Sequence, residues 1–269
     1  MNDGEYLRAK NPAEVERQLK TFSRLNETHK SFFKFLRENI DLNKNSKILE
    51  AGCGCGMFTN QIHSEFRSVV EGWDSNKKFI NFASKNFKGP NFKVKKIMSK
   101  VSESDFDLVL FRETLMEFKD TVNVLKWASN LLKDKGWIAA LEPDYGATII
   151  YPEIKGWKKF IDNYSKFCKE RGENFFIGRE LVDIFTKVEL RSIKVKPLIE
   201  IHTSLDKKKL SNFIDIEIMS IQTDMKDFLR TTGFSRKLVD KIFQEMKELC
   251  NYPGAYVQTS MVAICGQKL

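Results

Sequence analysis

Apolar positions over the first forty residues recur at alternating steps of three and four, which is the spacing of one helix face. The stripe begins just after Pro12, and proline suits the first position of a helix. We therefore predict one long helix over residues 12–40. Asn26 and His29 fall on its apolar stripe. They are expected either to form a satisfied polar pair where the helix meets the body of the protein or to line a ligand pocket.

Between residues 47 and 142, short apolar runs alternate with segments of helical spacing. The segments expected to be strands are 47–50, 68–74, 92–97, 107–112 and 137–142. The segments expected to be helices are 57–66, 79–87 and 121–135, the last of them capped by Gly136. Strands that alternate with helices over this length specify a parallel, doubly wound sheet.

Helical spacing covers most of the second half of the chain, with two strands among the helices. The helices are expected over 151–171, 179–187, 206–230 and 235–250, and the strands over 192–201 and 260–266. The helices between these two strands form an insertion. Insertions over the carboxyl edge of such sheets usually cover the ligand, so we expect this one to do the same.

The stretch from Ile48 to Gly56 passes from a buried strand to a glycine-rich turn within a few residues. Such a turn, followed by a helix N-terminus, lets a ligand approach bare backbone amides. A dinucleotide fingerprint needs a glycine where this chain has Met57, so pyrophosphate binding is disfavoured. Asp74, about twenty residues beyond Gly54, stands where a carboxylate accepts two ribose hydroxyls. Together these features favour an adenosine ligand that carries an amino acid instead of phosphates.

Composition indicates a globular protein with one substantial core. The chain has 269 residues, 42% of them hydrophobic, and no apolar run approaches the length of a membrane span. Since the first residues lack the apolar core of a signal peptide, we expect a soluble, cytoplasmic protein. The five cysteines are an odd number, and the Cys53-x-Cys55 pair lacks a second pair at metal-site spacing. Neither a disulfide framework nor a metal site is therefore expected.

The formal net charge of +9 suggests a nucleic-acid partner. The distribution of that charge weakens the suggestion, because basic and acidic residues interleave over most of the chain. The one sizeable run of a single sign consists of Lys88, Lys93, Lys95, Lys96 and Lys100. Nucleic acid therefore stays an alternative partner and is not the favoured one.

Several motifs taken together point to a known family. They are Glu50-x-Gly52-x-Gly54-x-Gly56 with Asp74, Phe106-Asp107-Leu108-Val109, Leu131-Leu132-Lys133-Asp134-Lys135-Gly136-Trp137, Glu142-Pro143-Asp144-Tyr145 and Ile177-Gly178-Arg179-Glu180-Leu181. The chain resembles the class I S-adenosylmethionine-dependent methyltransferases, in the branch that is similar to ubiquinone and menaquinone biosynthesis methyltransferases and related small-molecule enzymes. This resemblance implies an α/β, Rossmann-like fold. Its doubly wound, seven-stranded sheet is mostly parallel with an antiparallel last strand, and it carries an N-terminal helix and a helical cap insertion.

The resemblance also suggests how the chain is divided. We expect an N-terminal helical lid over residues 1–45, a methyltransferase core over 46–204 and 258–269, and a helical cap insertion over 205–257. In this family the third strand is an edge of the sheet, and edge strands carry lysines that prevent pairing with other chains. That role would explain the lysine run without any nucleic acid.

The cofactor that the resemblance implies is S-adenosylmethionine. The turn 52–54 would carry its methionine part, Asp74 would hold the ribose, and Glu50 would repel a phosphate while fixing an ammonium group or orienting the loop. Ile97 and Met98 stand where the family usually has an acid that binds the adenine amine, so apolar contacts and backbone bonds are expected there. The complete expected set is Tyr6, Gln18, Glu50, Ala51, Gly52, Cys53, Gly54, Asp74, Ser75, Ile97, Met98 and Arg112.

The expected reaction is in-line transfer of the sulfonium methyl group to a small molecule, with the protein supplying orientation and water exclusion. A general base is needed only if the nucleophile arrives protonated. The candidates by position are Glu113, Glu142, Asp144 and Tyr145. His202 is a further candidate by position, although a structural role explains it better. Nearby aromatic residues, among them Phe118, Tyr151 and Trp157, favour an apolar or aromatic acceptor.

Two other functions stay open from the sequence. The basic surface suits an RNA or protein methyltransferase. The missing adenine-binding acid suits a partner subunit that binds the cofactor without catalysis. We expect a monomer or a homodimer in either case.

Overall fold

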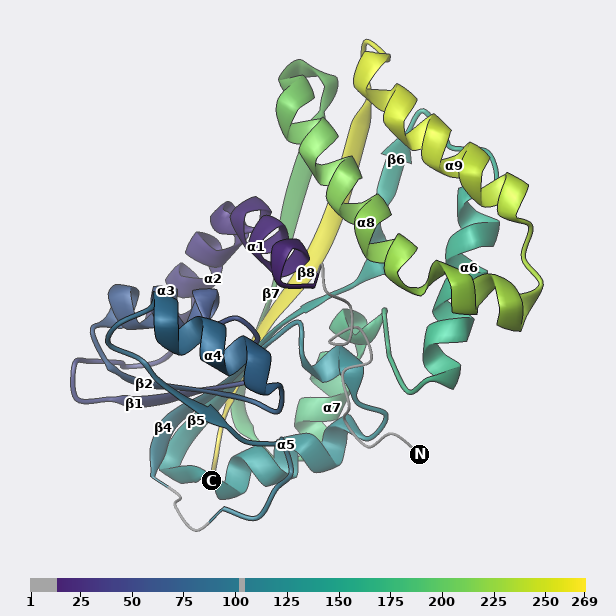
Figure 1. Ribbon diagram of the computed structural model, residues 1–269. Coiled ribbons are helices and arrows are strands. Elements are labelled where there is room, and N and C mark those ends of the chain that lie inside the picture. The colour runs from purple at the N-terminus through teal and green to yellow at the C-terminus, as the bar shows by residue number, and fades with distance from the viewer. Residues whose placement is uncertain (1–13, 102–104) are drawn as a thin grey trace.

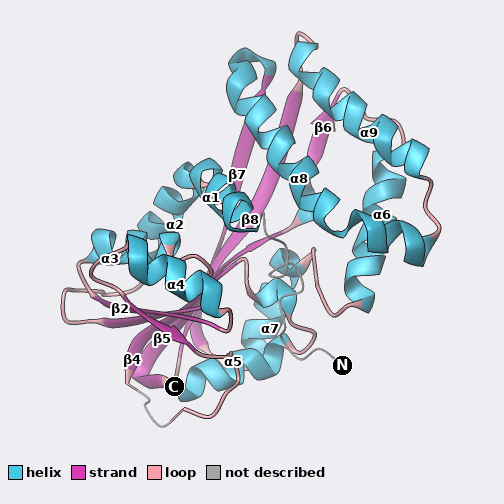
Figure 2. Cartoon of the chain, in the orientation of Figure 1, coloured by secondary structure: helices cyan, strands magenta, loops and turns pink. Residues whose placement is uncertain are grey.

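The alternating first half of the chain forms the parallel part of one sheet (Figures 1 and 2). The computed structural model describes residues 14–101 and 105–269. Five strands lie side by side in the order β3-β2-β1-β4-β5, each parallel to its neighbour. Their bounds are β1 Lys47–Ala51, β2 Val69–Asp74, β3 Asn91–Val94, β4 Phe106–Arg112 and β5 Leu132–Pro143. The predicted doubly wound α/β fold is confirmed.

Three later strands extend the sheet beyond β5. β8 (Tyr256–Gln267) runs antiparallel to β5, to β6 (Ile149–Tyr151) and to β7 (Arg191–Thr203). The antiparallel last strand is thus confirmed, but the described residues form eight strands where seven were expected. The additional strand is β6, whose three residues are too few to show an alternating pattern.

Helices cover both faces of the sheet because neighbouring strand residues point to opposite sides. Ile48 packs into one apolar cluster, together with α2 (Asn26–Asn39) and α3 (Met57–Phe66), whereas Leu49 packs into the other. The second cluster includes α5 (Thr121–Asn130) and α7 (Leu181–Lys187). The strands are therefore buried on both faces, as their unbroken apolar runs require.

The predicted long N-terminal helix is wrong, since the structure divides it into two. α1 (Glu14–Arg24) and α2 are separated at Leu25, whose ψ of 10° lies outside the helical range. Leu25 is buried, so the break accompanies the insertion of its side chain into the core. Apolar spacing continues across the break, so the break could not be predicted from the pattern. Pro12 lies outside the described residues.

A second correction concerns the helix predicted over 121–135. α5 ends at Asn130, and β5 begins already at Leu132, so Gly136 lies inside a strand instead of capping a helix. Similarly, β3 ends at Val94, which places Ile97 in the following loop. Both errors concern element ends, where tertiary packing outweighs the local pattern.

Helices α6 (Trp157–Glu170), α8 (Lys207–Thr232) and α9 (Arg236–Glu248) form a separate group beside β6 and the upper part of β8 (Figure 1). Phe160 of α6 holds the group together. Its ring lies 5.7 Å from that of Phe228 in α8 and 6.4 Å from that of Phe243 in α9. α4 (Lys77–Asn86) lies on the opposite side of the molecule, against β2 and β3.

The lysine run lies at β3, which is an edge of the sheet as expected. Lys93 forms an ion pair with Glu71 at 2.7 Å, and Lys95 lies 4.0 Å from the ring centre of Trp73. Both lysines therefore contact their own sheet. Within residues 14–101 and 105–269, no helix is both long and apolar enough to cross a membrane.

Candidate active site

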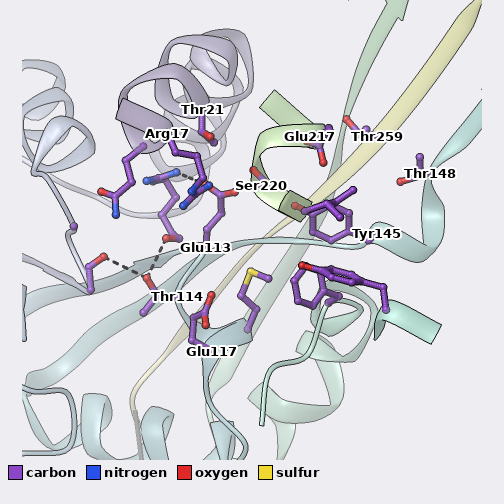
Figure 3. Close-up of a pocket in the computed structure, with 18 of the residues that line it drawn as sticks. Arg17, Thr21, Glu113, Thr114, Glu117, Tyr145, Thr148, Glu217, Ser220 and Thr259 are labelled. Atoms are coloured by element: carbon purple, nitrogen blue, oxygen red, sulfur yellow. Dashed lines mark hydrogen bonds and ion pairs between the residues drawn. The ribbon is translucent and has the colours of Figure 1, made fainter. Parts of the chain in front are cut away.

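One cavity opens at the carboxyl ends of the parallel strands and continues toward α6, α8 and α9 (Figure 3). Its empty space, including the open mouth, is about 1570 Å³. We call one end the turn end, lined by Gly52, Gly54, Asp74, Ser75, Phe79 and Ile97. The opposite end, the cap end, is lined from Tyr145 onward, by residues that include Trp157, Tyr164, Phe175, Phe213 and Glu217. Ligands of open α/β sheets bind at this edge.

The glycine turn is built so that backbone faces the cavity. Gly52 has φ +80°, and a Cβ placed on it would lie 2.5 Å from the Cγ2 atom of Thr114. Gly54 has φ +51°, and its added Cβ would lie 2.5 Å from the Oε1 atom of Gln18. Both positions therefore require glycine for conformation and for space.

Asp74 closes the turn from the end of β2. Its Oδ2 atom accepts a hydrogen bond from the N–H of Gly54 at 2.9 Å, and its Oδ1 atom accepts one from the N–H of Asn76 at 2.8 Å. Burial raises the pKa of this carboxyl above its ordinary value. Each carboxylate oxygen can accept more than one hydrogen bond, so both retain capacity toward the cavity.

Helix α1 lies over the turn and supplies part of the cavity wall. The Oε1 atom of Gln18 accepts a hydrogen bond from the N–H of Cys55 at 3.0 Å, while its Nε2 atom donates to buried Glu14 at 3.2 Å. Arg17 donates to the same Glu14 at 2.6 Å. The side chains of Arg17, Gln18 and Thr21 all line the cavity. The other expected residue of this segment, Tyr6, lies outside the described residues.

Arg112 and Glu113 lie between the two ends of the cavity, directly after β4. They form an ion pair with each other, and both line the cavity. Glu113 has φ +49°, an uncommon value for a residue other than glycine. The guanidinium carbon of Arg112 lies 5.4 Å from the ring centre of Phe58. The structure thus brings the expected Arg112 and Glu113 together.

Glu142 does not line the cavity, but it holds residues that do. It is fully buried and accepts hydrogen bonds from the backbone N–H groups of Thr114 at 2.9 Å, Leu115 at 2.8 Å and Met116 at 3.4 Å. Burial raises its pKa to about 8. Thr114 and Met116 do line the cavity, so Glu142 positions the short 3-10 helix that carries them.

Asp144 and Tyr145 have different surroundings although they are adjacent. Asp144 accepts hydrogen bonds from Nε of Arg179 at 3.0 Å and from its Nη2 at 2.8 Å, and a third from the N–H of Gly146 at 3.1 Å. Tyr145 enters the cavity, where its ring lies 5.2 Å from that of Phe175 (Figure 3). Asp144 therefore fixes the turn from which Tyr145 projects.

Several expected cofactor residues lie beside the cavity without lining it. Glu50 is fully buried, bonds the hydroxyl of Thr59, and has a pKa raised by burial to about 7. Ala51 and Cys53 are buried next to it. Met98 is half exposed and is not among the lining residues, whereas Ile97 is.

The polar residues of the N-terminal stripe do not line the cavity either. His29 is buried between the rings of Phe22 and Phe58, at 5.0 and 4.7 Å. Burial, followed by the charge of Arg112, lowers its pKa to about 2, so the imidazole is neutral. Asn26 is exposed. His202 is also buried, with its ring stacked 4.2 Å from that of Phe213.

Sequence reasoning expected the inserted helices to cover the ligand but named none of the residues of α8 that line the cavity. Phe213, Glu217, Ser220 and Ile221 lie on one face of this helix and line the cap end. A signal was present, because Glu217 interrupts an apolar stripe at helical spacing. Thr114, Phe79 and Thr259 also line the cavity and were not expected.

The fold and the site define a class of protein, and comparison with known families agrees. Residues 42–193 match the family model described as a methyltransferase domain, which is more than half of the chain. The chain belongs to this family, and it is a class I enzyme whose cofactor is S-adenosylmethionine. The glycine turn, which an added Cβ would obstruct, and the half-buried Asp74 at the cavity fit such a cofactor.

The particular relatives are small-molecule enzymes and bacterial proteins of the same fold. The chain is 27% identical over 227 residues to the phosphoethanolamine N-methyltransferase of Plasmodium falciparum, which covers 77% of each chain. A phosphoethanolamine N-methyltransferase 2 structure from Haemonchus contortus is 18% identical, with a TM-score of 0.56 over 89% of this chain. This chain spans only 52% of that one. The YcgJ protein of Bacillus subtilis is 14% identical, with a TM-score of 0.56 over 89% of this chain and 99% of its own.

Proposed function

We propose that the enzyme transfers the methyl group of S-adenosylmethionine to a small molecule with an apolar or aromatic body. The observation that carries this proposal is the continuity of the cavity, which joins the glycine turn to a wall of aromatic side chains. Such a space holds a donor and an acceptor side by side with little water between them.

The turn end suits the methyl donor. Asp74 would accept hydrogen bonds from the ribose hydroxyls, and Ile97 with Phe79 would contact the adenine ring through apolar surface. Arg17 and Arg112, near the glycine turn, would face the amino-acid part of the donor. When bound, the donor supplies an already activated methyl group on a sulfonium centre.

The protein residues supply orientation and exclusion of water. Helix α1 covers the turn, and α6, α8 and α9 surround the cap end, so we propose residues 14–45, the described part of the expected 1–45 segment, as a lid and residues 205–257 as a cap. Holding two reactants in a reactive arrangement contributes several kcal/mol, on the order of 7–11 in well-oriented model systems. Among the candidate bases, Glu113 and Tyr145 line the cavity, while Glu142 and Asp144 support it from outside.

The relatives support a small acceptor, but the cap end of this chain favours one that is less polar than theirs. The Haemonchus protein was solved with phosphomonomethylethanolamine and S-adenosylhomocysteine. The cap end of this chain is instead lined by Trp157, Ile161, Tyr164 and Phe175. We propose that an acceptor of this chain shares the small size of such a compound and has a more apolar body. No observation at the cavity favours RNA or protein as the acceptor.

The proposal is tested by two measurements on the full chain. Isothermal calorimetry should detect binding of S-adenosylmethionine and S-adenosylhomocysteine, and no comparable binding of NAD. Incubation with methyl-labelled donor and a panel of small aromatic acceptors should then transfer label to at least one of them. Binding of the donor without transfer to any panel member or to a cell extract would support a non-catalytic subunit instead.

A further inference from the structure

The charged groups around the cavity disfavour an anionic acceptor. Among the described residues, two arginines line the cavity, and each is already held by a carboxylate. Arg17 donates to Glu14 at 2.6 Å, and Arg112 is paired with Glu113. A phosphate or carboxylate entering the cap end would have to share a guanidinium whose charge is already balanced by one of these carboxylates.

The opposite charge is present in excess beside the cap end. Glu217 of α8 lines the cavity, with its side chain 14% exposed. Its Oε1 atom lies 3.6 Å from Nη2 of Arg24, but Arg24 also donates to Glu200 at 3.3 Å. A single buried guanidinium thus serves two carboxylates. Burial raises the pKa of Glu217, which shows that its negative charge is costly there.

The residues around Glu217 define what else the acceptor carries. Phe213 and Ile221 lie one turn away on the same face of α8, and Tyr145 faces the same space (Figure 3). Trp157 and Tyr164 complete the wall. Aromatic faces attract cations as well as apolar groups. A positively charged head on an apolar body would therefore match both the charge and the surface of the cap end.

We propose that the acceptor is an amine on an aromatic or other apolar body, and that the carboxylate of Glu217 binds its nitrogen. This inference rests on the proposed function. An amine that arrives as an ammonium ion gives one proton to the carboxylate. Its lone pair then forms the new N–C bond, the C–S bond breaks, and the electron pair of that bond stays on sulfur to give S-adenosylhomocysteine. The product leaves as a methylated ammonium ion, and Glu217 releases its proton to water.

The test compares three probes of similar size that differ in their polar group. They are 2-phenylethylamine, 2-phenylethanol and phenylacetate, each titrated by calorimetry into the full chain saturated with S-adenosylhomocysteine. The amine should bind most tightly and phenylacetate least. Glu217→Gln should weaken amine binding by about 30-fold, since truncating one partner of a buried charge pair costs at least about 2 kcal/mol. The same variant should leave binding of the alcohol within about twofold.

The matched control is Asp215→Asn, which removes a carboxylate from an exposed position of the same helix. It should leave all three affinities unchanged. Binding of phenylacetate as tight as that of the amine, no binding of the amine, or an unchanged amine affinity in Glu217→Gln would overturn the inference. Failure of S-adenosylhomocysteine to bind the unaltered chain would instead contradict the proposed function, so the two failures are distinguished.

Discussion

The amide oxygen of Gln18 accepts a hydrogen bond from the backbone N–H of Cys55 at 3.0 Å. This contact joins the helix that covers the cavity to the glycine turn beneath it. The two residues are 37 positions apart in the sequence. A polar side chain that lines the cavity therefore ties the covering helix to the glycine turn.

Replacing Gln18 with alanine should loosen this cover. We expect Gln18→Ala to weaken donor binding about fivefold, because one hydrogen bond contributes about 1 kcal/mol. Calorimetry with S-adenosylmethionine measures the change. Lys20→Ala is the control, since Lys20 is exposed on the same helix and forms an ion pair with Glu16. Equal affinity in both variants would contradict the role of Gln18.

The Asp74 carboxylate should matter more than the Gln18 amide, because it holds the turn and is the group that we propose binds the ribose. Asp74→Ala removes the acceptor of two backbone N–H groups, so donor binding should weaken by about 10- to 100-fold. Asp74→Asn, which keeps one acceptor oxygen, should be intermediate. Calorimetry with S-adenosylhomocysteine gives both values, and an unaltered affinity in Asp74→Ala would exclude the ribose contact.

Gly52 offers a test of close packing at the turn. Gly52→Ala adds a methyl group where Thr114 already stands 2.5 Å away, so the turn or Thr114 must shift. We expect a loss of about 1–3 kcal/mol in the free energy of unfolding and weaker donor binding. Gly233→Ala is a matched control, because Gly233 also has a positive φ, +65°, but nothing lies within 4 Å of its added Cβ. Urea unfolding of both variants separates the clash from backbone strain.

The buried carboxyl of Glu142 should make stability depend on pH. Its pKa is about 8 in the folded protein against an ordinary value of 4.5, so the folded state holds a proton that the unfolded state has released. The free energy of unfolding should therefore fall as the pH rises from 4.5 to 8, by about 1.4 kcal/mol for each unit of pKa difference.

Glu142→Gln should remove the contribution of Glu142 while keeping an acceptor for the three N–H groups. A contribution from Glu50 should stay between about pH 4.5 and 7, since burial raises its pKa from 4.5 to about 7. Urea unfolding at pH 5, 6.5 and 8 makes the comparison. A slope that is identical in Glu142→Gln and the unaltered chain would show that Glu142 does not titrate in this range.

The parallel core could be predicted from local patterns, because buried strands need apolar runs and the helices between them need an apolar face. Apolar runs end at the sheet edge where the ligand binds, so Gly52, Gly54 and Asp74 could be placed there from their order alone. The break at Leu25 and the end of α5 could not be predicted, because the apolar spacing continues through both. These features depend on packing between distant segments, which no short window of sequence contains.

The supporting residues show the same limit. Glu142 and Asp144 were candidate bases because they stand at the end of a strand, but neither lines the cavity. The direction of their side chains depends on the N–H groups after Arg112 and on Arg179, both far away in the sequence, so it could not be predicted. Glu217 was not named as a site residue, because it lies far in the sequence from every recognised motif although it lines the cavity.

The order in which the cavity wall occurs along the chain has an evolutionary consequence. The turn end and its covering helix come entirely from residues before 118, whereas the cap end begins at Tyr145. Selection for a new acceptor can therefore act on the later half of the gene while the earlier half is held constant by the methyl donor. Proteins that descend from this chain are expected to change their substrate through recombination or drift in the part of the gene that begins at Tyr145. The residues that bind the cofactor need not change.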